Sequence, residues 1–261
     1  WSCSWLRIEP FFRYSFFPLW LGYILFVDAL VVARHGTSLL QRMRWRYVTL
    51  FAVSSIFWWL FELLNVPVQN WHYSPDHPYS PLSFCLLASL NSSTVLPAVM
   101  GTTELLSTFK PLHPQLAPDD PGPRLSLPAF ISLEVVGVAF FVLPWLLPHY
   151  CFPLIWFSLI FLLDPINNVM GRKSAFAHLM VRDWRFFVLP LGALMCGFFW
   201  EMWNFYALPK WYYTVPFIGF WKVFEMPLLG FTGYLPFALE LFALYQFVLL
   251  VFRQKQDYLV I

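Results

Sequence analysis

Seven long apolar runs constrain the fold of this chain more than any other feature of its sequence. Each run has about 20 residues, which is enough to cross the roughly 30 Å hydrocarbon core of a bilayer as a helix. The runs are Phe16–Ala33, Val48–Val66, Leu82–Ser107, Pro128–Leu147, Cys151–Val169, Phe186–Ala207 and Leu229–Phe252. Since 59% of the residues are apolar and only 11% are charged, we exclude a soluble domain. We predict an all-α polytopic membrane protein with about seven transmembrane helices.

The chain also contains an internal repeat. Glu62 and Asn65, three residues apart in one apolar run, recur as Glu201 and Asn204 in another, and an aromatic triplet follows each pair, at 71–73 and 211–213. Other matched features flank these pairs: Asp28 and Asp164 before basic stretches, and Leu96-Pro97 before Glu104 as Leu235-Pro236 before Glu240. Spans one to three therefore correspond to spans five to seven.

The fourth span connects the two repeats. Because one span is an odd number, both three-helix repeats have the same orientation in the membrane, as in repeats related by an axis along the membrane normal. We predict a first repeat over 1–108, a Pro-rich linker and connector helix over 109–150, and a second repeat over 151–261. The linker itself is Lys110–Arg124. Its Asp119-Asp120 pair lacks the helical acidic setting of a diphosphate site, so we do not expect it to bind a metal ion.

The distribution of basic residues predicts the orientation. Of 16 Lys and Arg residues, all but Arg7, Arg13, Lys210 and Lys222 follow the odd-numbered spans or lie in the C-terminal tail. By the positive-inside rule, the N-terminus lies outside and the C-terminus in the cytoplasm, and we expect the bacterial inner membrane. The net charge of +2 then reflects membrane orientation and not nucleic-acid binding.

Aromatic residues follow the second and sixth spans, at the expected outer surface. They are Trp71, Tyr73, Trp211, Tyr212, Tyr213 and Trp221. Tryptophan and tyrosine are common at membrane interfaces, so we interpret this group first as an interfacial anchor.

Half of the 14 acidic residues lie inside the expected spans. A carboxylate at the centre of a bilayer costs about 2.5–3.5 kcal/mol even on lenient scales, so such groups are paired, protonated or facing a polar cavity. Glu240 is the deepest and our first choice as proton donor, and Glu201 and Glu62 are further catalytic candidates. We expect Asp28 and Asp164, near the cytoplasmic ends of their spans, to have an ion-pair or helix-end role.

The two Glu–Asn pairs lie on one helix face each, near the outer ends of their spans. They could line one cavity between the repeats, or each asparagine could satisfy its own glutamate or a neighbouring helix. We weigh these alternatives equally. The ligand-binding candidates are Asn65, Asn204, Trp59, Trp200, Trp203, Tyr234, Phe237 and Glu104. Pro97 and Pro236, inside the third helix of each repeat, would free carbonyl groups for a neighbour or a ligand.

The sequence predicts no metal ion and no cofactor. Its histidines lie in expected loops or at span ends, so the paired mid-membrane ligands of a b-type haem are absent. We find no phosphate-binding glycine loop, and no serine or cysteine with a visible His-acid partner.

The order Trp200-Glu201-Met202-Trp203-Asn204, then Trp211-Tyr212-Tyr213, then Leu235-Pro236 and Glu240 resembles that of the small integral-membrane lycopene cyclases. Those enzymes have two homologous three-helix units, joined by an extra span when fused. Their adjacent Glu-Glu pair is absent here, since Pro236 is followed by the single Glu240. The resemblance implies acid-catalysed cyclisation or isomerisation of a carotenoid or isoprenoid.

Three functions stay open at this stage. The first is an intramembrane enzyme in which a glutamate protonates an olefin and aromatic faces stabilise the cation. The second is a non-enzymatic subunit of a larger membrane complex that binds lipid, quinone or pigment. The third is a small transporter or proton pathway. The expected partners are membrane lipid, a lipophilic small molecule and other membrane subunits, with no nucleic acid.

Overall fold

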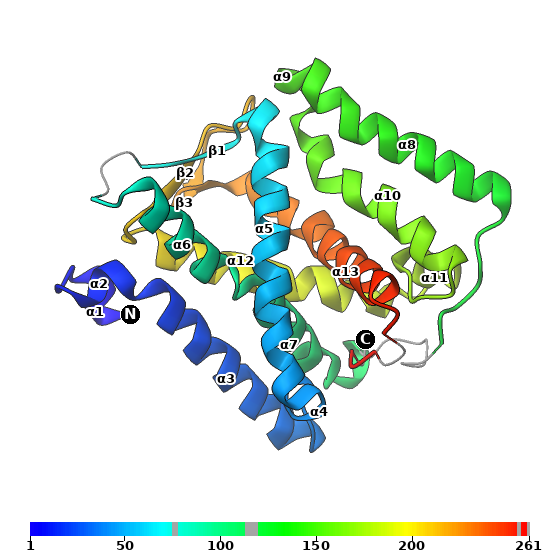
Figure 1. The fold of residues 1–261 in the computed structure, drawn as a ribbon, viewed down its shortest axis with the longest axis horizontal. Helices are drawn as coiled ribbons and strands as arrows, with labels where there is room; N and C mark the ends of the chain where they lie inside the picture. The colour runs from blue at the N-terminus through cyan, green and yellow to red at the C-terminus, as the bar shows by residue number, and fades with distance from the viewer. Residues whose placement is uncertain (75–77, 113–119, 255–256, 260–261) are drawn as a thin grey trace.

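The computed structural model describes residues 1–74, 78–112, 120–254 and 257–259, and it is mostly helical (Figure 1). Part of the expected linker, including Asp119, lies outside the described residues. The longer helices are α3 (Phe16–His35), α5 (Val48–Val68), α6 (Pro81–Ser92), α7 (Val95–Ser107), α8 (Leu127–Leu146), α10 (Ile155–Val169), α12 (Val188–Asn204) and α13 (Tyr234–Val251). The short helices are α1 (Ser2–Trp5), α2 (Phe11–Tyr14), α4 (Leu39–Met43), η1 (Arg44–Tyr47), η2 (Lys110–Leu112), α9 (Pro148–Cys151), η3 (Phe152–Leu154), α11 (Ala175–Met180), η4 (Trp184–Phe187) and η5 (Leu228–Gly233).

Six helical segments within the described residues are long and apolar enough to cross a membrane. They are Phe16–His35, Leu39–Val68, Pro81–Ser107, Leu127–Leu146, Pro148–Val169 and Leu228–Val251. The prediction of a helical membrane protein is thereby confirmed at this level. The remaining apolar run is covered by η4 and the 17-residue α12. That length is at the short end of the range for a spanning helix, so the count of seven spans stays a prediction.

The third apolar run, predicted as one span, is a membrane-capable segment over Pro81–Ser107 that consists of two helices. The structure breaks it between α6 and α7, at Ser93 and Thr94. The Ser93 hydroxyl donates to the carbonyl oxygen of Leu90 at 2.6 Å, and Thr94 donates to that of Asn91 at 2.7 Å. Side-chain hydroxyls that bond nearby carbonyl groups compete with the helical hydrogen-bond pattern, so a polar cluster interrupts an otherwise apolar run.

The two prolines also lie differently from the prediction. Pro97 is the third residue of α7, and Pro236 is the third residue of α13. A proline in the first turn of a helix lacks an N–H that would have no helical partner anyway. Neither proline therefore frees a mid-helix carbonyl group for a ligand.

Helix α12 is held close to both α7 and α13 by two glycines. A Cβ atom on Gly192 would lie 2.6 Å from the Thr103 hydroxyl of α7, and one on Gly197 would lie 2.4 Å from the Tyr234 ring of α13. Small residues of this kind let helices approach closely. Helices α3 and α5 also pack on α7, and α10 packs on both α8 and α13.

Four short strands complete the described fold: β1 (Trp71–Tyr73), β2 (Trp211–Tyr213), β3 (Lys222–Val223) and β4 (Met226–Pro227). Strands β1 and β2 are antiparallel, with Trp71 opposite Tyr213, His72 opposite Tyr212, and Tyr73 opposite Trp211. They lie at the end of α5 that is remote from α4 (Figure 1). Two aromatic segments that are far apart in the sequence are thus joined side by side.

Candidate functional site

A large apolar cavity lies beside the β1–β2 pair. Its volume is about 730 Å³, and it receives side chains from α5, α6, α10, α12, α13 and both strands. The lining includes Trp58, Trp71, Tyr73, Ala88, Asn91, Trp156, Trp200, Trp211, Tyr213, Tyr234 and Phe237. Segments from both sequence repeats therefore form one cavity.

The wall of this cavity is a set of packed aromatic rings. Trp156 of α10 lies 5.7 Å from Trp71 and 5.9 Å from Phe237, measured between ring centroids. Trp200 stacks on Tyr234 at 5.9 Å. The interplanar angles include both stacked and edge-on arrangements, which are the favourable geometries for aromatic pairs. The cavity thus presents ring faces and edges to whatever fills it.

Glu201 lies behind this wall and is fully buried. Its Oε1 atom accepts hydrogen bonds from the hydroxyl groups of Tyr213, at 2.6 Å, and Tyr234, at 2.9 Å. Burial, reinforced by the neighbouring carboxyl group, raises the pKa of Tyr213 well above its ordinary value, so this hydroxyl stays protonated and donates. Both tyrosines also line the cavity. They connect the buried acid to the cavity.

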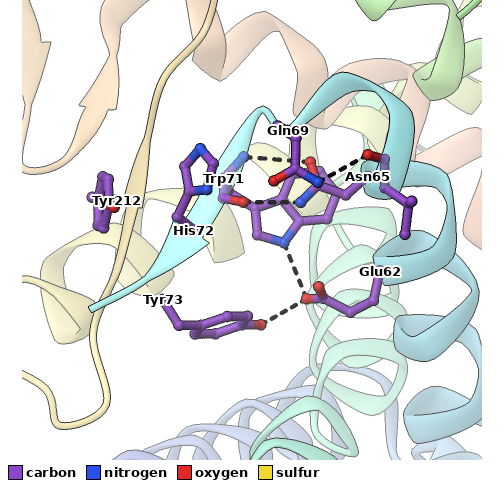
Figure 2. Close-up of a pocket in the computed structure, with 8 residues that line it drawn as sticks. Glu62, Asn65, Gln69, Trp71, His72, Tyr73 and Tyr212 are labelled. Carbon is purple, nitrogen blue, oxygen red and sulfur yellow. Dashed lines mark hydrogen bonds between the residues drawn. The ribbon is translucent and has the colours of Figure 1, made fainter. Parts of the chain in front are cut away.

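Glu62 lies in a separate, more open pocket of about 440 Å³ (Figure 2). Its Oε1 atom accepts from the Tyr73 hydroxyl at 2.7 Å and from the Trp71 indole N–H at 3.0 Å. Burial and the adjacent carboxylate raise the pKa of Tyr73 well above its ordinary value. Trp71 and Tyr73 line both cavities, so these two side chains form the wall between them.

The two asparagines hold the strand backbones. The Asn65 amide donates to the carbonyl oxygen of Trp71 at 2.9 Å and accepts from the N–H of Asn70 at 2.8 Å. Asn204 donates to the carbonyl oxygen of Trp211 at 2.8 Å and accepts from its N–H at 2.9 Å. Each asparagine therefore fixes the turn from helix to strand. This role differs from both alternatives considered for the Glu–Asn pairs.

Glu240 and Glu104 bond to backbone groups of neighbouring helices. Glu240 Oε1 accepts from the N–H of Leu159 at 2.9 Å. Glu104 accepts from the N–H of Leu39 at 2.9 Å and forms an ion pair with Arg42 at 2.7 Å. Neither residue is among the described residues that line the two cavities. The helix-end role expected of Asp164 is confirmed, since it accepts from the N–H groups of Ala175 and Phe176 at the start of α11.

The five remaining candidates lie in three different places. Trp200, Tyr234 and Phe237 line the large cavity. Trp203 packs against Trp20 at 4.8 Å in the core. Trp59 is 39% exposed, and its indole N–H donates to the Ser89 hydroxyl at 2.9 Å. The structure therefore brings three of these candidates to the cavity and places Trp59 on an outer helix face.

Sequence reasoning missed three residues of the site. Tyr73 and Tyr213 were interpreted as interfacial anchors, but their hydroxyl groups bond Glu62 and Glu201. Tyr73 follows Glu62 by 11 residues and Tyr213 follows Glu201 by 12, and this repeated spacing was the signal that could have identified them. Trp156 lies eight residues before Asp164, as Trp20 lies eight residues before Asp28, and this shared spacing was the signal that could have identified it.

Three properties define the class of this protein: helices that can span a membrane, few strands, and an aromatic cavity whose wall tyrosines are hydrogen-bonded to buried or half-buried carboxyl groups. The chain matches no protein-family model, and no curated protein or solved structure is significantly similar to it. Among the described residues, no group of three His, Cys, Asp or Glu side chains is arranged to hold a metal ion.

Proposed function

We propose that this chain is an integral membrane protein that binds an isoprenoid- or carotenoid-like molecule in the aromatic cavity. The supporting observation is the cavity itself, with its volume of about 730 Å³ and its lining of tryptophan, tyrosine and phenylalanine. Binding sites for small molecules commonly measure about 300–1,000 Å³ and are mostly apolar with a few polar groups. An isoprenoid chain would bury its apolar carbons there and pack against the rings.

The proposal includes the membrane arrangement inferred from the sequence: seven spans with α12 as the sixth, two parallel repeats, and an outer N-terminus. The register of β1 and β2 supports it. His72 pairs with Tyr212, which occupies the same place in the second repeat. Two equivalent strands related by a twofold axis along the membrane normal run antiparallel and meet at equivalent residues. The cavity then lies between the repeats, towards the outer face.

For the reaction, we assign the acid to Glu201 in preference to Glu240. Glu201 bonds two tyrosines of the cavity wall, whereas Glu240 bonds the backbone of α10. In the protonated acid the carboxyl group donates to a tyrosine oxygen. That tyrosine gives its own hydroxyl proton to one carbon of a C=C bond, takes up the carboxyl proton in its place, and leaves a carbocation on the other carbon. The aromatic faces stabilise this cation. A carbon next to the cation then loses a proton, which the carboxylate takes up. This completes an isomerisation or cyclisation without a co-reactant.

Ligand binding is tested by purifying the protein in mild detergent, extracting it with organic solvent and identifying the bound compound by absorbance and mass spectrometry. Ala88 of α6 lines the cavity, so Ala88→Phe fills part of its volume and lowers the occupancy at least fivefold. The matched control is Ala29→Phe, because Ala29 is exposed on α3. Equal occupancy in both variants would contradict binding in this cavity.

Catalysis is tested by incubating the purified protein with the compound class that co-purifies. Glu201→Gln keeps an oxygen that accepts from both tyrosines but removes the acidic proton. We expect product formation to fall at least 100-fold with ligand occupancy unchanged.

A non-enzymatic subunit is the second candidate. One observation favours it: Glu104 and Glu240, two of the proposed site acids, hold backbone N–H groups of other helices and so have a structural role. A stoichiometric ligand that is recovered unchanged, with the same occupancy in Glu201→Gln, would select this function over the enzyme.

A further inference from the structure

We propose that the Glu62 pocket is a second binding site, and that its ligand is an organic ammonium cation. The pocket is lined by Glu62, Asn65, Val66, Gln69, Trp71, His72, Tyr73 and Tyr212. It is separate from the large cavity, because the side chains of Trp71 and Tyr73 lie between them. The inference does not depend on what the large cavity binds.

The carboxylate of Glu62 is held in place with one oxygen available. Figure 2 shows its side chain extending from α5 towards Trp71 and Tyr73. Both side-chain donors bond the same atom, Oε1. Within the described residues no donor to Oε2 is found, so that oxygen can accept from a ligand. Two fixed donors reduce the entropy that the side chain would lose on binding.

Among the described residues, the carboxyl group of Glu62 forms no ion pair. Glu62 is the one acidic residue of the pocket, and no lysine or arginine is among the residues that line it. Lys210, on the β2 side of the molecule, is paired with Glu225. A half-buried carboxylate without a paired cation attracts a ligand cation more strongly than a solvated one does.

The remaining lining favours an organic cation over a metal ion. Ca²⁺ and Mg²⁺ need six or more oxygen ligands, but the Asn65 side-chain oxygen already accepts from the N–H groups of Asn70 and Trp71. The pocket instead offers aromatic rings from Trp71, Tyr73 and Tyr212. Aromatic faces attract ammonium groups by cation–π interaction, which strengthens as the cation is desolvated. The volume of about 440 Å³ accommodates a substituted ammonium group.

The corresponding glutamate of the second repeat cannot bind in this way. Glu201 is fully buried and accepts from Tyr234, a residue of α13. The first repeat has Val95 where the second has Tyr234, so Glu62 lacks this second tyrosine donor.

The test is calorimetric titration of the detergent-solubilised protein with tetramethylammonium chloride, using tert-butanol as a neutral probe of similar shape. We expect one saturable site for the cation and none for tert-butanol. Glu62→Gln keeps the acceptor for Trp71 and Tyr73 but removes the charge, and it weakens binding at least tenfold. Glu225→Gln, which removes a carboxylate already paired with Lys210, leaves the affinity within twofold.

Absence of saturation with the wild-type protein, or an affinity within twofold in Glu62→Gln, would overturn the proposal. If Glu62→Gln does not fold, Tyr212→Leu replaces it. Tyr212 is 37% exposed, and loss of its ring should weaken binding about fivefold, whereas an unchanged affinity would again overturn the site.

A second titration distinguishes two sources of the ammonium group. The protein is placed in nanodiscs of phosphatidylcholine or of phosphatidylglycerol. Weaker apparent binding of tetramethylammonium in phosphatidylcholine identifies a lipid headgroup as the competing ligand. Equal binding in both lipids identifies a free amine.

Discussion

Glu62 and Glu201 hold the same position in the sequence repeat, but their surroundings differ. Each accepts a hydrogen bond from the tyrosine at the end of the following strand, Tyr73 or Tyr213. Glu201 is sealed from solvent by the second tyrosine, Tyr234, whereas Glu62 borders an open pocket. The surroundings of Glu201 are suited to keeping a carboxyl proton, and those of Glu62 are suited to binding a ligand that enters from solvent.

The residue four positions before each glutamate explains the difference. It is Gly197 before Glu201 and Trp58 before Glu62. Tyr234 lies directly over Gly197, where a Cβ atom would be 2.4 Å from its ring. Trp58 instead lines the large cavity and donates its indole N–H to Tyr73 at 3.3 Å. A glycine lets α12 and α13 pack closely beside Glu201, whereas the side chain of Trp58 occupies the equivalent position on α5.

The largest effect is expected from Gly197→Ala. The added methyl group overlaps the Tyr234 ring, and overpacking of a tight contact costs about 1–3 kcal/mol. Loss of the Tyr234–Glu201 hydrogen bond adds to this, so we expect about 3 kcal/mol in total, measured as a lower thermal midpoint in detergent. The matched control is Gly22→Ala, because nothing lies within 4 Å of a Cβ atom there. Equal midpoints for the two variants would contradict the packing argument.

Replacing Asn65 or Asn204 tests the feature that the two regions share, which is an asparagine that holds the turn from helix to strand. Asn65→Ala and Asn204→Ala each remove hydrogen bonds to a strand backbone. Leaving such buried backbone groups unsatisfied costs about 1–3 kcal/mol. We expect losses of about 2 kcal/mol for both variants, and little change for Gln41→Ala on the exposed side of α4. A loss in only one of the two asparagine variants would mean that the turns are not equivalent.

The sequence predicted the membrane helices well, because burial in a bilayer requires apolar runs of a definite length. Several site residues are also close to one another in the sequence. Glu201 and Trp200 are adjacent in the chain, and Tyr234 and Phe237 lie in the same turn of α13. Local patterns of this kind are visible without knowing the fold.

Contacts between distant segments could not be predicted in the same way. Glu240 bonds the N–H of Leu159, which is 81 residues away, and nothing near either residue indicates the pairing. Trp156 reaches the cavity wall because α10 packs on α13, and this also depends on the tertiary arrangement. The break between α6 and α7 depends on local hydroxyl groups, and it was missed because apolarity dominated the interpretation.

A second comparison concerns the short helices α4 and α11. Each begins after a capping serine, Ser38 or Ser174. The residue four positions later is Arg42 in α4 and His178 in α11. Arg42 pairs with Glu104, whereas His178 is paired with Asp183 at 3.0 Å, and histidine is the side chain whose ordinary pKa lies near neutrality.

We therefore predict a pH-dependent stability that arises from α11. Burial lowers the pKa of His178, opposed in part by Asp183 and assisted by Lys173. The unfolded chain then takes up its proton at a higher pH than the folded one, so the stability falls as the pH drops below about 6.5. The thermal midpoint should decrease between pH 7.5 and 5.5, and His178→Gln should reduce this decrease. Equal pH dependence in both proteins would exclude His178 as its cause.

The smallest effect is expected from Trp59→Phe, which gives α5 the residue found at the equivalent position of α12, Phe198. Both side chains are largely exposed, and substitutions on an outer surface usually change stability by less than about 0.5 kcal/mol. The variant loses the bond to Ser89 and little else, so ligand occupancy should stay unchanged. Trp200→Phe alters the cavity wall and should lower the ligand occupancy. A matching fall in Trp59→Phe would place Trp59 back among the ligand-binding residues, and would mean that the outer face of α5, as well as its inner face, contacts the bound molecule.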